Sequence, residues 1–352
     1  MSTTLRPPAP PAATGRARRR TPTVAARGLA MVLVALTVAG LGGAVAESAL
    51  ARSDHERYPA PGRVVDTAQG VLHLHCSGSG SPTVLLEAGL GEPGLTWADI
   101  QDQLDTSLRV CSYDRAGYGW SPAAEGTWDV RDAATQVTSA LDAAGQDGPY
   151  LVVAHSVGAL VARELRHSHP SSVAGLVLID PTNEVTLNGV GTPSPAIAER
   201  TVLRVLARTG VVRLLGNRLV PALAGSRPPQ ELLDHAPAAY HSDAMAASIR
   251  ELRGAPGAAA HLLTSEDTDW GDLPVTVVSA ATTSRQDRDH HRNLAARSSA
   301  GQHLTADVGG HYVHYDDPDL VVTAVCGVAA AARAPGCCPA MTPFAPSTVR
   351  SC

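Results

Sequence analysis

Residues 150–163, with the sequence YLVVAHSVGALVAR, constrain the fold of this chain more than any other stretch. The apolar run that opens the stretch predicts a buried strand, and its Ala- and Leu-rich end predicts a helix. Ser156 lies at the turn between them, a position that exposes a hydroxyl at the carboxyl end of a parallel sheet, beside the free N–H of Val157. The small residues Ala154 and Gly158 permit the close backbone approach that such a turn needs. The usual pattern has glycine in place of Ala154, and an ordinary turn serine fits the same residues, so the rest of the chain must decide.

The composition is that of a large globular protein. The chain has 352 residues, 44% of them hydrophobic, which allows one large domain or two of ordinary size. Its net charge is −5, and the amino terminus carries its one dense basic patch, so the sequence indicates no nucleic-acid partner. Aromatic residues are scarce, with Phe344 as the single Phe. Ala, Val and Leu must therefore build the core.

The amino-terminal region predicts export or membrane insertion. Residues 1–27 are rich in Pro, Arg and Ala, and we expect them to be disordered. Residues 28–46 contain no charge, and the segment 28–50 is interpreted as either a cleaved signal peptide or a single transmembrane anchor. The triplets 44–46 and 49–51 both resemble A-x-A cleavage sites. The positive flank places the body of the chain outside the cytoplasm, either secreted or anchored to the cell membrane.

Strand and helix patterns alternate along most of the remaining chain. The predicted strands are 63–66, 71–76, 83–87, 109–113, 150–154, 173–179, 274–280 and 304–308. The predicted helices around them are 95–108, 128–144, the helix after Ser156, 288–299 and 319–332. This alternation predicts an α/β fold, in which a mostly parallel twisted sheet has helices on both faces.

Residues 182–272 interrupt the alternation with helical patterns alone, over 196–215 and 229–253. We interpret this region as a helical lid inserted into a core formed by residues 60–181 and 273–333. Because the lid is rich in Leu, Val and Ala, it predicts a modest apolar pocket for a small molecule. Residues 334–352 form a Cys- and Pro-rich tail.

Four motifs in order resemble the α/β-hydrolase superfamily over about residues 60–333. They are EAGLG at 87–91, YDRAGYGWS at 113–121, AHSVG at 154–158 and GGHYVHYDDP at 309–318. The YPAPG segment after the apolar amino terminus makes the chain most similar to bacterial exported or membrane-anchored members. The resemblance implies the fold of that superfamily, with nucleophile, acid and histidine in this chain order.

The resemblance also implies roles for individual residues. Ser156 corresponds to the nucleophile and His311 to the general base, since a serine hydroxyl needs a neighbouring imidazole to take its proton. His314 is the rival histidine, but His311 directly follows two glycines in a loop that can approach the serine. The oxyanion hole is expected at the N–H groups of Val157 and Leu90. Many relatives have His-Gly where this chain has Ala-Gly before Leu90, a change that leaves a backbone donor in place.

The acidic residue of the triad has two candidates. Many members carry it a few residues after the strand that precedes the histidine, where this chain has no carboxylate until Asp287 and Asp289. Asp180 ends the preceding strand, and some relatives, including haloalkane dehalogenases, take their acid from that position. The alternative for Asp180 is a structural cap. We favour Asp180 over Asp287, because the acid must be buried beside Nδ1 of the imidazole.

Cysteines and histidines elsewhere are given structural roles. In the strand order of the superfamily, Cys76 and Cys111 lie on neighbouring strands, which implies a disulfide in an oxidising compartment. Four further cysteines lie in the last helix and the tail, at positions 326, 337, 338 and 352. His73, His75 and Cys76 alternate on one strand and offer two metal ligands at most, so neither a metal nor an organic cofactor is expected. Asp114 and Arg115 are expected to tie their loop together, and His290 and His291 to lie on a solvated helix.

Together these features predict a serine hydrolase that cleaves a carboxylic ester, or a similar acyl substrate, through an acyl-enzyme on Ser156. The expected partner is a small, apolar acyl compound, with membrane contact only through residues 28–46 if they are retained. Three alternatives stay open: a peptidase, a cofactor-free peroxidase of the same superfamily, and a relative that binds ligands without catalysis.

Overall fold

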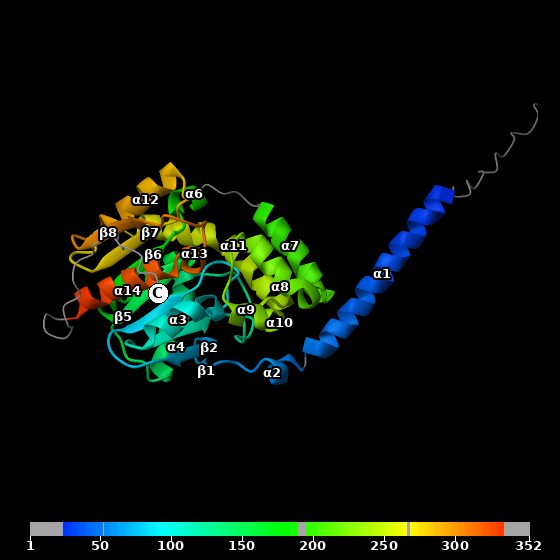
Figure 1. Ribbon diagram of the computed structural model, residues 1–352, viewed down its shortest axis with the longest axis horizontal. Helices are drawn as coiled ribbons and strands as arrows, with labels where there is room; N and C mark the ends of the chain where they lie inside the picture. Colours follow the sequence, from blue (N-terminus) through cyan, green and yellow to red (C-terminus); the bar gives the residue numbers. More distant parts are fainter. Residues whose placement is uncertain (1–23, 52, 189–194, 266–267, 334–352) are drawn as a thin grey trace, which may run out of the picture. The chain divides into compact units, whose positions relative to one another are not determined.

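The structure, a computed structural model, describes residues 24–51, 53–188, 195–265 and 268–333 (Figure 1). The chain divides into two compact units, residues 1–42 and 43–352. The described part of the first unit belongs to α1 (Val24–Ala51). Residues 24–27, which we predicted as part of a disordered terminus, lie in this helix, and the rest of that prediction falls outside the described residues. Within residues 26–51, an 18-residue window has a mean hydropathy of 2.3, which suits a membrane-spanning helix or a signal sequence.

One eight-stranded sheet organises the second unit. Its strands are β1 (Arg63–Thr67), β2 (Gly70–Ser77), β3 (Thr83–Glu87), β4 (Val110–Asp114), β5 (Tyr150–His155), β6 (Val173–Ile179), β7 (Val275–Ser279) and β8 (Gly301–Thr305). The spatial order is β1-β2-β4-β3-β5-β6-β7-β8. The first two pairings are antiparallel and the other five are parallel. The predicted α/β fold with a mostly parallel sheet is confirmed.

Helices cover both faces of this sheet (Figure 1). One face packs against α4 (Val130–Ala143), α5 (Gly158–Ser168) and α12 (Arg285–Ala295), and the other against α3 (Ala98–Leu104) and α14 (Pro318–Ala332). Successive residues of a strand point to opposite faces of the sheet. Leu85 and Val152 belong to the first core, whereas Val84 and Leu86 belong to the second. This period of two is why the central strands appear in the sequence as continuous apolar runs.

Two predicted elements near the carboxyl end were misplaced. The strand predicted at 304–308 is β8 at Gly301–Thr305, and the helix predicted at 288–299 begins at Arg285. Ser284 is the N-cap of that helix, because its hydroxyl accepts the N–H of Asp287 at 3.1 Å. The prediction that His290 and His291 are solvated is wrong. His291 is buried, with Nδ1 2.8 Å from the hydroxyl of Ser279, and His290 pairs with Glu184 at 2.9 Å.

The described residues between β6 and β7, a region that we interpreted from the sequence as a lid, form helices and loops and no strand. The helices are α6 (Glu184–Asn188), α7 (Pro195–Arg208), α8 (Val211–Ala224), α9 (Gln230–Asp234), α10 (Ala236–Ala239) and α11 (Ser242–Thr264). The single helix predicted at 196–215 is therefore two helices, separated by Gly210, whose φ of +79° favours glycine. Leu203, Val212 and Met245 form a small core of their own with Tyr118.

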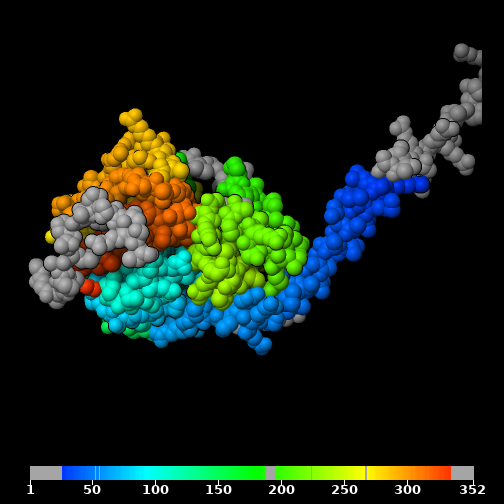
Figure 2. Space-filling model, in the orientation of Figure 1, coloured from blue at the N-terminus to red at the C-terminus, as the bar shows by residue number. Residues whose placement is uncertain are grey.

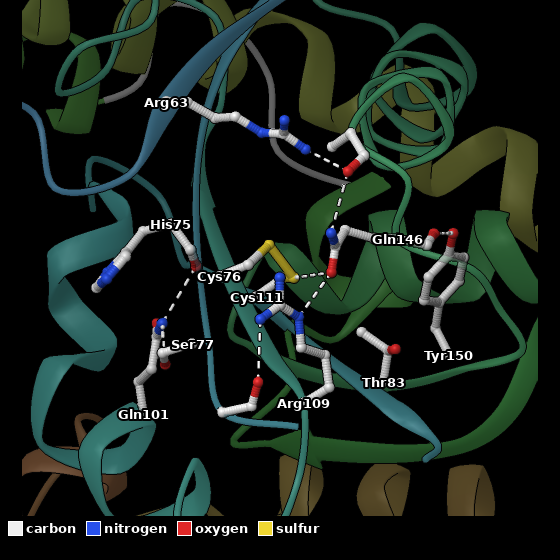
Figure 3. The surroundings of a disulfide bond; sticks show 12 residues. Arg63, His75, Cys76, Ser77, Thr83, Gln101, Arg109, Cys111, Gln146 and Tyr150 are labelled. Atoms are coloured by element: carbon white, nitrogen blue, oxygen red, sulfur yellow. Dashed lines mark hydrogen bonds between the residues drawn. A yellow bond between two sulfur atoms is a disulfide. The ribbon is translucent and has the colours of Figure 1, made fainter. Parts of the chain in front are cut away.

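Cys76 and Cys111 form the disulfide that the resemblance implies (Figure 3). They are directly opposite residues of the antiparallel β2–β4 pair, and their Cα atoms are 4.1 Å apart. Gln146 lies beside the bond and accepts a hydrogen bond of 2.7 Å from Nε of Arg109. Of the four cysteines near the end of the chain, Cys326 is in α14, and the other three fall outside the described residues.

Candidate active site

Ser156 lies on a sharp turn between β5 and α5. Its φ is +52°, a left-handed conformation that a residue with a side chain adopts at a cost. Gly158 makes the turn possible, since a Cβ there would lie 2.5 Å from the carbonyl oxygen of Ala88. The strand–turn–helix predicted from the sequence therefore has the geometry of a nucleophile elbow, which presents the serine hydroxyl at the carboxyl end of the sheet.

His311 lies between Ser156 and Asp180. Its Nε2 is 2.9 Å from Oγ of Ser156, and its Nδ1 is 2.6 Å from Oδ2 of Asp180. The other oxygen of Asp180 accepts two hydrogen bonds, from the Thr283 hydroxyl at 2.6 Å and from the N–H of Ala280 at 3.1 Å. The carboxylate is thus fixed on one side by β7 and the loop after it, and on the other by the imidazole.

Electrostatics favour a charged Asp180 at neutral pH. Burial by itself raises the pKa of this carboxyl, but the hydrogen bonds from His311 and Thr283 and the charge of His311 lower it to about 2. A carboxylate beside Nδ1 keeps the proton of a neutral imidazole on that nitrogen, which leaves Nε2 free to accept the proton of Ser156. The arrangement can therefore abstract a proton from the serine.

The rival residues are engaged elsewhere. Asp287 accepts hydrogen bonds from Asn183 at 3.0 Å and from the Ser284 hydroxyl at 2.7 Å, at the start of α12. His314 is buried in α13 (Val313–Asp316), and its Nε2 is 3.3 Å from the hydroxyl of Thr96. Burial, together with the neighbouring His155, lowers the pKa of His314 well below its usual value, so this ring is neutral.

The expected oxyanion donors lie at two backbone positions. Val157 is the N-cap of α5, where an N–H group has no partner within the helix. Leu90 lies in the loop after β3, and contacts on both sides fix that loop. The N–H of Gly89 donates to Glu92 at 3.0 Å, and the N–H of Gly91 donates to the hydroxyl of Tyr118 at 3.3 Å.

A second pair of residues, which the sequence analysis missed, supports the histidine. His155 contacts Glu92 through Nδ1 at 3.2 Å and the backbone carbonyl of His311 through Nε2 at 3.0 Å. Burial lowers the pKa of His155, but the adjacent Glu92 raises it above its usual value overall. Burial raises the pKa of Glu92, yet the charge of His155 brings it to about 2. The polar residue directly before the serine was the available signal.

Glu92, His155 and His314 also present donor atoms of the kinds that zinc takes, within 4.8 Å of one another. Glu92 and His155 are, however, hydrogen-bonded to each other, to Gly89 and to His311. Glu92 and His155 therefore form an ion-paired network that joins the loop after β3 to the histidine loop, whereas Nδ1 of the buried His314 has no hydrogen-bond partner among the described residues.

Arg115 also supports the loop after β3. It is buried and donates to Glu251 at 2.7 and 3.0 Å, and to the carbonyls of Ala88 and Gly89 at 2.6 and 2.8 Å. Glu87 is its second carboxylate partner at 2.5 Å, and burial raises the pKa of Glu87 to about 7. Arg115 therefore ties the loop to α11 of the lid. Asp114 has the structural role expected of it, since it accepts the N–H groups of Gly94 and Trp120.

A cavity of about 80 Å³, with a largely apolar lining that also includes Glu92, Glu199 and Arg200, lies between this loop and the lid. Leu90 and Tyr312, which are neighbours of the site residues, line one side. Leu203, Val212 and Leu219 of α7 and α8 line the other. The cavity therefore adjoins the loop that carries one expected oxyanion donor, in a place where a substrate acyl group could lie.

Several known proteins similar to this chain carry the names of hydrolases. Lipase LipV of Mycobacterium tuberculosis is 37% identical over 34% of this chain and 44% of its own length. RutD of Klebsiella pneumoniae, provisionally named a carbamate hydrolase, is 28% identical over 71% of this chain and 92% of its own. A Pseudomonas aeruginosa structure, provisionally described as an epoxide hydrolase, has a TM-score of 0.59 at 22% identity, over 77% of this chain and 95% of that one. The chain spans less than half the length of several curated relatives, LipV among them.

The family follows from the longest match. Residues 82–318 match the family described as alpha/beta hydrolase fold, and this segment is more than half of the chain. It contains the elbow, Asp180 and His311, and the solved structure above shares the fold. The chain therefore belongs to the α/β-hydrolase family.

Proposed function

We propose that this protein is a serine hydrolase that cleaves carboxylic esters, with Ser156 as nucleophile, His311 as general base and Asp180 as the acid. The observation that carries the proposal is the continuous contact from Ser156 through His311 to Asp180, at 2.9 and 2.6 Å. These are the distances that proton transfer from a serine to an imidazole requires.

The reaction proceeds in two halves. In the first, Oγ of Ser156 bonds to the ester carbonyl carbon while Nε2 of His311 takes its proton, and the N–H groups of Val157 and Leu90 bind the oxyanion. The ester C–O bond then breaks, and the alcohol leaves with the proton from His311. In the second half, His311 takes a proton from water, the resulting hydroxide attacks the acyl-enzyme, and Ser156 is released with its proton restored.

The cavity under the lid supports a short acyl group as the substrate. At ~30 Å³ for each water-sized group, a volume of about 80 Å³ holds two or three such groups. Its walls include apolar residues of α7 and α8, and three charged residues, Glu92, Glu199 and Arg200, also line it. The proposed substrates are therefore esters of small acids.

A serine at the elbow also separates this proposal from epoxide hydrolysis, to which the neighbouring structure is provisionally assigned. In this superfamily, epoxide hydrolases and dehalogenases use an aspartate at the elbow as the nucleophile, and Ser156 lacks a carboxylate. Acyl transfer is the chemistry that a hydroxyl activated by an imidazole performs.

A series of p-nitrophenyl esters of increasing chain length tests the proposal on the full chain in detergent. We expect turnover of the acetyl to butanoyl esters, with kcat/KM falling for longer chains. Ser156→Ala should abolish turnover, with a loss of roughly 10⁶-fold in kcat, whereas Ser299→Ala on the surface should retain it. Turnover that survives Ser156→Ala would contradict the nucleophile, and a preference for long chains would contradict the cavity argument alone.

A further inference from the structure

The lid is fixed to the carboxyl end of the apolar helix by one arginine. Arg213 of α8 donates to both oxygens of Glu47 at 2.7 and 2.9 Å, and to both oxygens of Asp54 at 2.8 and 2.5 Å. All three side chains are largely buried. Bidentate pairs of this kind are strong and directional. The last turns of α1 and the start of α8 therefore form one rigid contact.

Backbone packing strengthens this contact. A Cβ added at Gly43 would lie 2.5 Å from the carbonyl oxygen of Thr209, in the turn between α7 and α8. Glu47 also approaches Gly210 in the same turn. The end of α1 thus packs directly on the α7–α8 turn, with no room for a side chain at Gly43.

This contact lies at the place where a bilayer would end. The uncharged run of α1 covers residues 28–46, and at 1.5 Å a residue it is ~28 Å long, close to the ~30 Å of a bilayer core. Glu47 is the first charge after it and belongs at the membrane–water boundary. Since Arg213 is paired with Glu47, the start of α8 lies at the same boundary.

The exposed surface of α8 at this point is apolar. Leu214 and Leu215 directly follow Arg213 and are 79% and 46% exposed. In a helix, Leu214 lies about 200° around the axis from Val212, which faces the cavity together with Leu219. One side of α8 therefore lines the cavity and the opposite side presents Leu214 outward, while the half-exposed Leu215 lies about 60° from Val212 at the edge of the cavity side.

The same region of the lid is strongly basic, although the chain as a whole is acidic. Residues 195–227 contain six arginines and one glutamate, whereas the chain as a whole has a net charge of −5. Arg208 and Arg218 are exposed. Arg218 lies four residues after Leu214, which places the two side chains together on one helix face. Figure 2 shows the green lid helices at the surface of this unit.

We propose that α8 docks onto an anionic membrane surface, with Leu214 and Leu215 among the acyl chains and Arg208 and Arg218 against lipid phosphates. In this proposal residues 28–46 are a retained anchor, and the membrane is the one that they would enter. Apolar side chains flanked by arginines are the features by which a helix binds an anionic bilayer surface. Docking would hold one wall of the cavity against the bilayer, where apolar esters collect.

Tryptophan fluorescence of the full chain in vesicles tests this proposal. All four native tryptophans are buried, so a Leu214→Trp variant adds one exposed reporter. In vesicles of phosphatidylcholine and phosphatidylglycerol, brominated acyl chains should quench more than half of the added emission. Val308→Trp, at an exposed position after the opposite edge strand of the sheet, is the matched control and should show no quenching.

Two results of the fluorescence experiment would contradict the docking proposal. If the emission added by Leu214→Trp is quenched no more than the emission added by Val308→Trp, the docking proposal is overturned. A blue shift without quenching, lost when the protein-to-lipid ratio is lowered, would show that a second copy of the chain covers α8 instead. The arginines are tested separately. Arg208→Gln with Arg218→Gln should reduce quenching in anionic vesicles to the level seen in pure phosphatidylcholine, and no effect would contradict the proposed headgroup contact.

Discussion

At the scale of single residues, backbone strain coincides with the proposed chemistry. Among the residues that the structure describes, Ser156 and Asp180 are the two non-glycine residues with positive φ, at +52° and +39°. Such conformations cost about 1–3 kcal/mol each and persist where surrounding contacts enforce them. Here Gly158 allows the first, and the bonds of Asp180 to Ala280, Thr283 and His311 fix the second.

Glu92→Gln tests the ion pair that supports His311. The pKa of His155 is raised, so this group stabilises the fold fully below its ordinary 6.5 and less as pH rises through the raised value. The pKa of Glu92 is lowered to about 2, so its contribution is present above its ordinary 4.5 and disappears only in strong acid. Removing one charge from this buried pair should lower the free energy of unfolding by about 3 kcal/mol near neutral pH.

Urea unfolding from about pH 6 to about pH 9 measures the effect, because the gap between wild type and Glu92→Gln should narrow as His155 loses its proton. Since His155 positions the His311 backbone, kcat should also fall by roughly 10-fold or more with little change in KM. Glu125→Gln, at an exposed site, is the control. A constant gap across this range would show that His155 is neutral.

Candidate roles of single residues could be predicted where they depend on the local sequence. They could not be predicted where they depend on contacts between distant parts of the chain. The elbow pattern pointed to Ser156 and two glycines pointed to His311, and the structure brings these two side chains within hydrogen-bond distance. The Glu92–His155–His311 connection joins residues 63 and 156 positions apart, which no local pattern reveals. His291 was misjudged because its helix is mostly polar, although His291 and Leu294 form a buried stripe with i,i+3 spacing.

At the scale of elements, buried strands were predictable and the edge strand was not. The strand β3 was predicted to the residue because both faces are covered and its sequence is a continuous apolar run. The edge strand β8, GQHLT, is only partly buried and has no such run. The apolar residues just after it, which include Val308, led the prediction three residues too far along the chain.

The Cys76–Cys111 disulfide, which joins β2 and β4, should contribute a measurable amount to the stability of the fold. It closes a segment of 35 residues, so its loss through Cys76→Ser with Cys111→Ser should lower the free energy of unfolding by roughly 3–4 kcal/mol. Urea unfolding of the full chain in detergent measures this loss. Thiol titration of the unfolded, unreduced chain checks the pairing. The single variant Cys76→Ser should raise the thiol count by one, as it frees Cys111, whereas a fall by one would mean that no bond existed.

At the scale of the whole molecule, the α/β-hydrolase core and the inserted lid contribute different parts of the candidate active site. The core supplies the proposed nucleophile and acid, at the carboxyl ends of β5 and β6, and the proposed histidine, in the segment after β8. The lid supplies the cavity wall and is joined to the core through the buried Arg115–Glu251 pair. The sequence predicted a helical lid because the alternation of strand and helix patterns stops there. It could not show which lid residues face the cavity.

Labelling by a fluorophosphonate, read by intact mass on the full chain, tests the central claim most directly. We predict one adduct on the wild type and none on Ser156→Ala. Asp180→Asn should slow labelling by roughly 10³–10⁴-fold, because the imidazole loses its orienting carboxylate. Asp287→Asn should leave the rate within about threefold, since surface hydrogen bonds contribute little. An unlabelled wild type would contradict an activated serine, and slow labelling of Asp287→Asn alone would reassign the acid.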